Sequence, residues 1–302
     1  MNQVFSNKKA IAVFILPSLI LFTVVGFIPI LQSFYYSLLD WDGIQPAKFV
    51  GFAYYKDLFI TDTYGMEFGH SVLNTIYLAI LSVCLQLPIA LLLALILAKG
   101  IKGEKIYRTI FFIPVVVSSA AIGLMFLRVY NPDYGVLNVF LQRIGLKSWT
   151  HDWLTEDKTS LISILIPVIW QYIGYHMLLM YAAIKGISED LYEAATIDGA
   201  SGIRTAISIT IPLIVPILRV CIIFAVIGSL KFFDLVYVMT GGAPSPSTDV
   251  PSTLMYTTIF TRHMYGYGST MAIFLVIECL VFYLVLQRVL KTREEKEAEK
   301  GR

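Results

Sequence analysis

Long apolar segments recur along the chain, separated by shorter polar stretches. A membrane-spanning helix needs about 20 mostly apolar residues, because about 30 Å of hydrocarbon is crossed at about 1.5 Å per residue. Four segments of this kind contain no Asp, Glu, Lys or Arg: 10–39, 71–98, 109–127 and 159–184. Two more are apolar but carry charged residues: 211–239 and 269–290. The pattern predicts an all-α integral membrane protein with six transmembrane helices.

The composition supports a membrane protein over a soluble one. Apolar residues make up 57% of the chain and charged residues only 15%, whereas soluble globular chains carry about 25% charged residues. The net charge of +2 excludes an extended nucleic-acid-binding surface. The three cysteines lie in apolar runs and lack the spacing of a zinc site. An alternative for the first segment is a signal peptide, but its apolar run is too long and no small-x-small cleavage site ends it.

The distribution of Lys and Arg predicts the topology. If the N-terminus lies in the cytoplasm and the helices alternate in direction, fourteen basic residues fall on the cytoplasmic side and seven fall outside. This asymmetry predicts a multi-pass protein of the cell membrane with both termini in the cytoplasm. The chain then divides into an N-terminal segment with the first helix and an external loop at 1–70, a region of five helices at 71–290, and a charged cytoplasmic tail at 291–302.

One cytoplasmic loop, at about 185–212, carries helix signals of its own. Ser188 is a favourable N-cap, and two acidic residues follow it in the first turn, where the helix dipole favours anions. Gly199 is a good C-terminal stop, because glycine adopts the left-handed conformation without strain. These signals predict a helix of about ten residues outside the membrane, then a second short helix capped by Ser201. Such a helix is either a plain connector between two spans or a docking element.

The order of residues in this loop favours the docking element. The loop holds, in sequence, Glu193, Ala194 and Ala195, then Gly199 after three residues, then Ile209, Ile211 and Pro212. This resembles the Glu-Ala-Ala, Gly, Ile-x-Leu-Pro motif of binding-protein-dependent ABC importer permeases, with Ile211 where Leu is usual. Segments similar to the sugar-type members occur in the family's order at 49–55, 107–114, 131–135, 233–237 and 240–242. The chain is identified as a member of the maltose-type and glycerol-phosphate-type permeases of carbohydrate ABC importers.

The resemblance implies a type I ABC importer permease fold, with 71–290 as the transport domain. It also implies a second homologous permease, two ATP-binding cassette subunits and an extracytoplasmic solute-binding protein as partners, in contact with membrane lipid and without nucleic acid. The chain contains no G-x-x-x-x-G-K-[ST] stretch, so it has no P-loop of its own. We therefore expect no cofactor in this chain, and ATP and magnesium on the ATPase subunits.

In that family the loop helix docks in a cleft of the ATPase subunit. The small Ala194 and Ala195 would keep one side of the helix narrow, Glu193 would offer a charge to the partner, and Gly199 would reverse the chain. The predicted coupling residues are Glu193, Ala194, Ala195, Asp198, Gly199, Ile209, Ile211 and Pro212.

Two other function classes fit the sequence less well. An ion-coupled secondary transporter would show repeated halves with broken helices and ion ligands at membrane depth. An enzyme is not expected, because the chain has no H-E-x-x-H or G-x-S-x-G motif and its four histidines are scattered. Lys231 and Asp234 are three residues apart, so we expect them on one helix face, paired either for function or only for neutralisation. Glu278 faces either the bundle interior or a second permease.

The resemblance places a substrate path in the spans on either side of the coupling loop. Tyr172 and Tyr175 lie one turn apart in the fourth span, as Ser229 and Phe232 do in the fifth, with Gly228 beside them. Aromatic rings can cover the apolar faces of sugars, and hydroxyl groups can bond to sugar hydroxyls. The alternative is ordinary helix packing. We expect an oligosaccharide rather than glycerol phosphate, because no basic cluster lies at membrane depth; a polyol is a further alternative.

Overall fold

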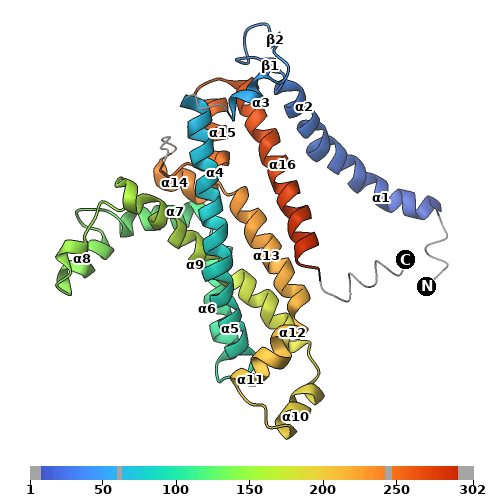
Figure 1. Cartoon of the computed structure of the whole chain (residues 1–302), viewed down its shortest axis with the longest axis vertical. Helices are drawn as coiled ribbons and strands as arrows, with labels where there is room; N and C mark the ends of the chain where they lie inside the picture. Colours follow the sequence, from blue (N-terminus) through green and yellow to red (C-terminus); the bar gives the residue numbers. More distant parts are fainter. Residues whose placement is uncertain (1–7, 60–62, 242–246, 292–302) are drawn as a thin grey trace. The chain divides into compact units, whose positions relative to one another are not determined.

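The chain is helical along nearly its whole described length (Figure 1). The computed structural model describes residues 8–59, 63–241 and 247–291. Its α-helices are α1 (Lys8–Phe22), α2 (Ile28–Tyr36), α3 (Ala53–Asp57), α4 (Thr63–Leu81), α5 (Leu87–Ala98), α6 (Glu104–Val116), α7 (Ser119–Val129), α8 (Val136–Arg143), α9 (Asp157–Lys185), α10 (Glu189–Ile197), α11 (Ile203–Thr205), α12 (Ile211–Leu213), α13 (Val215–Leu230), α14 (Asp234–Thr240), α15 (Pro251–Phe260) and α16 (Tyr265–Val289). Two short strands, β1 (Leu39–Asp40) and β2 (Lys48–Phe49), pair antiparallel. The tail predicted at 291–302, apart from Lys291, and Gly242 of the 240–242 motif lie outside the described residues.

The prediction of an all-α membrane protein is confirmed. Among the described residues, five helical stretches are long and apolar enough to cross a membrane. They are Ile11–Tyr36, Gly65–Ala98, Asp157–Lys185, Val215–Thr240 and Tyr265–Val289. The count reaches six if the bent pair of α6 and α7 is taken as one further span.

That bent pair corrects the prediction for 109–127, which is not one straight helix. α6 and α7 meet at an angle of 94°. Pro114 lies in the last turn of α6, and Val117 is already extended (φ −71°, ψ 137°). The Ser118 hydroxyl then accepts a hydrogen bond from the Ala121 N–H (3.2 Å) and caps a new helix. A hydropathy pattern cannot show this break, because Val and Ser on either side of it are compatible with a continuous span.

Three helical stretches each contain a five-residue π-helical segment that ends two residues before a proline. These segments are Thr23–Phe27 before Pro29, Ser82–Gln86 before Pro88, and Ala206–Thr210 before Pro212. Proline lacks the backbone N–H and its ring clashes with the carbonyl group four residues earlier, so the helix is locally rewound. The proline that ends the predicted coupling motif therefore has a structural consequence, which is a widened turn at the entrance to α12 and α13.

The described residues up to Met66 form one compact unit together with Met255–Ile277. In this unit the first turn of α16 lies against the β1 strand, since a Cβ atom on Gly266 would lie only 1.8 Å from the Leu39 carbonyl oxygen. The Tyr54 hydroxyl donates to the Asp40 carboxylate (2.6 Å), and the Tyr54 ring meets the Tyr267 ring edge-on at 5.3 Å between centroids. Within 11–36 no side chain is buried.

The second unit holds Glu67–Leu254 and the described residues from Glu278 onward. Its central helix is α9, which packs on α5 and α6. A Cβ atom on Gly174 of α9 would lie 1.9 Å from the Phe111 carbonyl oxygen, so α6 and α9 touch backbone to backbone there. One buried cluster centres on Leu165 and Leu235, and a second centres on Met177 and Cys221. Both clusters border the cavity described next.

Candidate functional site

A cavity of about 590 Å³ lies in the second unit, between α4 with its π-helical end, α9, α13 and the start of α14. Its lining residues include every residue predicted for the substrate path: Tyr172, Tyr175, Gly228, Ser229 and Phe232. The sequence placed these residues on two separate helices. The tertiary structure brings them together around one space. The predicted helix face shared by Ser229 and Phe232 is wrong, because α13 ends at Leu230 and Phe232 lies after it. Their role in transport stays a prediction.

These residues differ in how much of each is already engaged in contacts with other parts of the protein. The Ser229 hydroxyl is buried, donates to the Ala225 carbonyl oxygen (2.7 Å) and lies 3.3 Å from the Ser82 hydroxyl. Phe232 belongs to the buried cluster around Leu235. Both therefore pack helices as well as line the cavity. Gly228 is different, because a Cβ atom built on it would have no neighbour within 4 Å.

Further residues of the cavity were missed in the sequence analysis. Phe224 lies one turn before Gly228, and its ring centroid is 6.4 Å from that of Tyr175. The His176 ring meets Tyr175 nearly edge-on at 5.2 Å, and its buried Nδ1 has no hydrogen-bond partner in the described structure. Phe224 could have been found from the i, i+4 spacing on α13. Gln86 could not, because the π-helical segment before Pro88 shifts the faces that a regular α-helix would predict.

The predicted pairing of Lys231 and Asp234 on one helix face is wrong. α13 ends at Leu230 and α14 begins at Asp234, so the two residues belong to different helices. Both line the cavity with exposed side chains, and the structure shows no ion pair between these two described residues. Lys231 is instead the C-cap of α13 and Asp234 is the first residue of α14, positions at which the helix dipoles favour a cation and an anion. Glu278 on α16 is buried, and its Oε2 has no hydrogen-bond partner among the described residues.

The predicted loop helix is present as α10, and its end follows the prediction. Gly199 has φ +75°, in the left-handed region. The Ala200 N–H donates to the Ala195 carbonyl oxygen (2.8 Å), and the Gly199 N–H donates to that of Thr196 (3.1 Å). These two bonds form a Schellman motif, which satisfies carbonyl groups that the helix end would leave free. The chain therefore reverses at Gly199 with a defined geometry.

The start of α10 and the following turn differ from the prediction. Ser188 has the extended backbone of an N-cap, but its hydroxyl donates to the Asp190 carboxylate (3.2 Å) rather than accepting from the backbone. Ser201 does not cap the next helix. Gly202 takes that position with φ 57° and ψ −115°, a backbone conformation open essentially to glycine alone.

The exposed face of α10 carries most of the predicted coupling residues of the helix. Glu193, Ala194 and Asp198 are exposed, whereas Ala195 is buried against the rest of the chain. The idea that both alanines keep the outer side narrow is therefore wrong for Ala195, which instead lets α10 approach its own protein. Ile197 is 87% exposed, an apolar contact residue that the sequence analysis did not single out.

α10 is linked to the entrance of α13 by a polar contact. The Tyr192 hydroxyl lies 3.2 Å from the Thr210 hydroxyl, at the end of the π-helical segment before Pro212. Ile209 and Ile211 on either side of Thr210 are half-buried, and Pro212 is exposed. The contact thus ties α10 to the start of the α13 span through Tyr192 and Thr210, which adjoin predicted coupling residues without belonging to them.

Comparison with known proteins gives a consistent family. The family described as "Binding-protein-dependent transport system inner membrane component" matches residues 86–296. The chain is 34% identical over 293 residues to the probable ABC transporter permease protein YurN of Bacillus subtilis, which covers 96% of this chain and 99% of YurN. It is 33% identical to the trehalose/maltose transport system permease protein MalF of Thermococcus litoralis, covering 93% of each chain.

A solved structure shares the fold. It is a chain in the crystal structure of a bacterial alginate ABC transporter in complex with an alginate pentasaccharide-bound periplasmic protein. The TM-score is 0.82 at 24% sequence identity, and the match covers 96% of this chain and 98% of the other.

Proposed function

The chain belongs to the inner membrane components of binding-protein-dependent transport systems, and from this premise we propose that it is a permease subunit that imports a sugar or oligosaccharide. It would work with a second homologous permease, two ATP-binding cassette subunits that hold ATP and magnesium, and an extracytoplasmic solute-binding protein. The region 71–290 would form the transport domain, with both termini in the cytoplasm.

The observation that carries the proposal is the architecture of α10. This helix exposes Glu193 and Ala194, ends in a fixed reversal at Gly199, and joins two long apolar spans, α9 and α13. A soluble ATPase could grip such a helix from the cytoplasm. Motion of the helix would reach the cavity through the Tyr192–Thr210 contact and α13.

The cavity supports a neutral, ring-shaped cargo. Tyr175 and Phe224 offer aromatic faces, and Lys231 and Asp234 are of opposite charge. A phosphate dianion would require a cluster of cations, which this lining lacks among the described residues, so glycerol phosphate is disfavoured. A polyol lacks the flat apolar face that an aromatic ring covers. The proposal also agrees with the trehalose/maltose system named for one relative.

The test separates the coupling helix from the cavity. Permease variants would be reconstituted with their partner subunits and the solute-binding protein, and both solute uptake and ATPase stimulation by the loaded binding protein would be measured. For Gly228→Leu and Tyr175→Ala we expect a steep loss of uptake with stimulation largely kept, since the cavity changes while the docking surfaces do not. For Glu193→Lys we expect both activities to be lost.

Gly228→Leu is the sharper of the two cavity variants, because the new Cβ atom enters open space, with no atom of another helix within 4 Å. Ser229→Leu would be ambiguous, since it also removes a buried hydroxyl from the α4–α13 contact. Normal uptake in both Gly228→Leu and Tyr175→Ala would refute the cavity as the path. Normal uptake in Glu193→Lys would make α10 a plain connector.

A further inference from the structure

The helix α8 has its apolar side turned outward. Val136, Phe140 and Ile144 follow each other at intervals of four residues, so they form one stripe on and directly after this helix. Their exposed fractions are 68%, 56% and 52%. Asn138, on another face of α8, is only 4% exposed. α8 therefore packs Leu137 inward against the cluster around Leu165 and Leu235 and also presents an apolar stripe outward, where a helix on a water-facing surface is polar.

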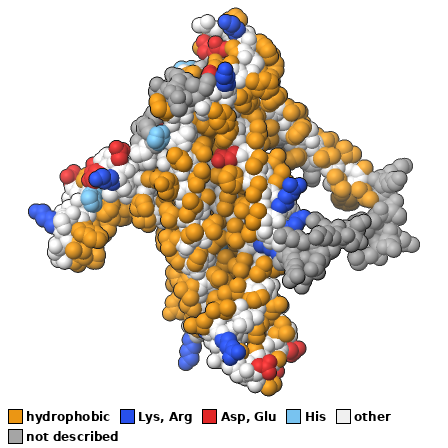
Figure 2. Space-filling view, viewed as in Figure 1, with side chains coloured by type: hydrophobic (Ala, Val, Ile, Leu, Met, Phe, Trp, Pro, Cys, Tyr) orange, Lys and Arg blue, Asp and Glu red, His pale blue; other side chains and the backbone are white. Residues whose placement is uncertain are grey.

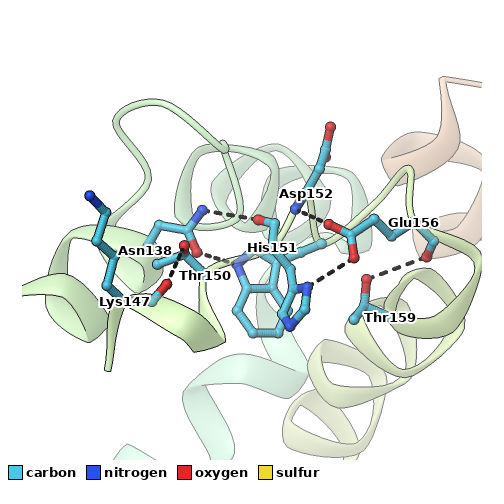
Figure 3. A network of polar contacts seen from close by, with 8 residues as sticks. Asn138, Lys147, Thr150, His151, Asp152, Glu156 and Thr159 are labelled. Carbon is cyan, nitrogen blue, oxygen red and sulfur yellow. Dashed lines mark hydrogen bonds and ion pairs between the residues drawn. The ribbon is translucent and has the colours of Figure 1, made fainter. Parts of the chain in front are cut away.

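The orientation of α8 is held by hydrogen bonds of the buried Asn138 side chain to partly buried partners (Figure 3). The Asn138 amide donates to the backbone carbonyl oxygens of His151 (3.0 Å) and Pro132 (3.2 Å). The Trp153 indole N–H donates to the Asn138 side-chain oxygen (2.7 Å). Rotating α8 to bury the stripe would break all three bonds and leave the Asn138 amide unpaired, so the outward stripe is imposed by the fold.

The apolar surface continues past α8 and has cations beside it. Leu146 is 40% exposed and Trp149 63% exposed, and the exposed Arg143 and Lys147 lie among the same residues. In Figure 2 the acidic side chains of the arm formed by α8 and the residues up to α9 gather along its upper edge, whereas orange apolar side chains cover its lower end. The acidic side chains of the arm thus lie apart from its apolar lower end.

We propose that α8 and the segment up to Trp149 lie in the headgroup region of the adjacent membrane leaflet, with the Val136–Phe140–Ile144 stripe against the acyl chains. Apolar residues flanked by Lys and Arg, with a Trp at the border, match the chemistry of that zone, where the basic side chains reach lipid phosphates. Leu124 and Met125 on α7, which packs on α8, are exposed apolar side chains as well. The acidic side chains lie apart from the apolar end of the arm, as anionic headgroups require.

The test uses a photo-reactive residue in the full-length permease, assembled with its partners. Phe140 is replaced by p-benzoylphenylalanine, which keeps an aromatic side chain at that position. Gln142, exposed two residues further along and on the opposite face of α8, receives the same replacement as a matched control. The complexes are placed in vesicles of phosphatidylethanolamine and radiolabelled phosphatidylglycerol, with and without the solute-binding protein, and irradiated.

We expect lipid label on the permease from position 140 at a level several-fold above that from position 142, unchanged by the binding protein. Equal labelling at both positions would overturn the proposal, since a water-exposed arm does not distinguish them. A cross-link from position 140 to the binding protein or to another permease subunit, in place of lipid, would also overturn it. The readout does not require transport, so its failure is separate from failure of the proposed function.

Discussion

The two short helices α8 and α10 are of nearly equal length, eight and nine residues, and both lie outside the long spans of the same unit. They differ in what they bury. α10 buries Ala195 and exposes Glu193 and Asp198, whereas α8 buries Asn138 and exposes Phe140. The exposed face of α10 therefore carries two carboxylates, whereas that of α8 carries an apolar stripe.

The difference shows that amphipathicity alone does not say which side of a short helix is the inner one. In α10 the orientation follows from a close approach that only a small residue permits, together with the Tyr192–Thr210 contact. In α8 it follows from the buried Asn138 amide, which forms hydrogen bonds with three groups of the following segment and the preceding turn. A few specific contacts fix the orientation of each helix. The residues on its outward face do not take part in these contacts, so their polarity can match whatever surrounds that face.

The largest effect is expected at the reversal that fixes α10. Gly199→Val should abolish uptake, because φ +75° is strained by about 1–3 kcal/mol for a β-branched residue and the docking geometry would be lost. Gly199→Asn should keep much of the uptake, since Asn tolerates the left-handed region. The measurement is solute uptake at matched membrane abundance. Equal uptake in the two variants would mean that the conformation of Gly199 does not matter.

Substitutions at the two alanines of α10 distinguish docking to the ATPase subunit from packing against the rest of the chain. Ala195→Leu inserts a large side chain into a buried position and should destabilise the unit by about 1–3 kcal/mol, seen as a lower temperature of unfolding. Ala194→Leu lies on the exposed face, so stability should hold while ATPase stimulation by the loaded binding protein falls. If the thermal effects were reversed, the burial of the two alanines described above would be wrong.

The anchor of α8 is tested at Asn138. Asn138→Ala removes the hydrogen bonds to the Trp153 N–H and to two backbone carbonyl groups, at about 0.5–1.5 kcal/mol per bond. Faster hydrogen exchange of the α8 amides should follow, measured by mass spectrometry of the complex in a bilayer. Gln142→Ala is the control, and as an exposed substitution it should change stability by less than about 0.5 kcal/mol. Unchanged hydrogen exchange of the α8 amides in Asn138→Ala would contradict the role of Asn138 as the anchor of α8.

The smallest effect is expected from the protonation of Glu156 at acidic pH. Hydrogen bonds from the Asp152 N–H and the His151 side chain hold the pKa of Glu156 below its ordinary value. A carboxyl group with a lowered pKa in the folded state stabilises that state at pH above its unfolded pKa, and the stabilisation is lost as the pH falls through the folded value. The protection of the arm's amides, calculated relative to the intrinsic exchange rate at each pH, should therefore fall at acidic pH. The fall should be smaller in Glu156→Gln, and an identical pH dependence of protection in both proteins would contradict this.

Several features of the fold and the site could be predicted from sequence because their causes are local. The apolar segments, the extent of α10 and the left-handed Gly199 depend on residues within a turn or two of each other. The cavity residues Tyr172, Tyr175 and Gly228 were predicted from the family resemblance and from i, i+3 spacing. The predictions were wrong where a helix breaks, as between α6 and α7 and between Leu230 and Asp234, because hydropathy does not record backbone direction.

By itself, then, the sequence determined that this is a multi-pass helical membrane protein with a capped helix between two spans, since long apolar runs and helix ends are set by nearby residues. Only the tertiary structure decided which faces meet around the cavity, that Ala195 points inward, and that α8 turns its apolar stripe out. Those outcomes depend on partners distant in the chain, such as Phe111 against Gly174 and Trp153 against Asn138. The free energy of such contacts exists only once the helices have packed.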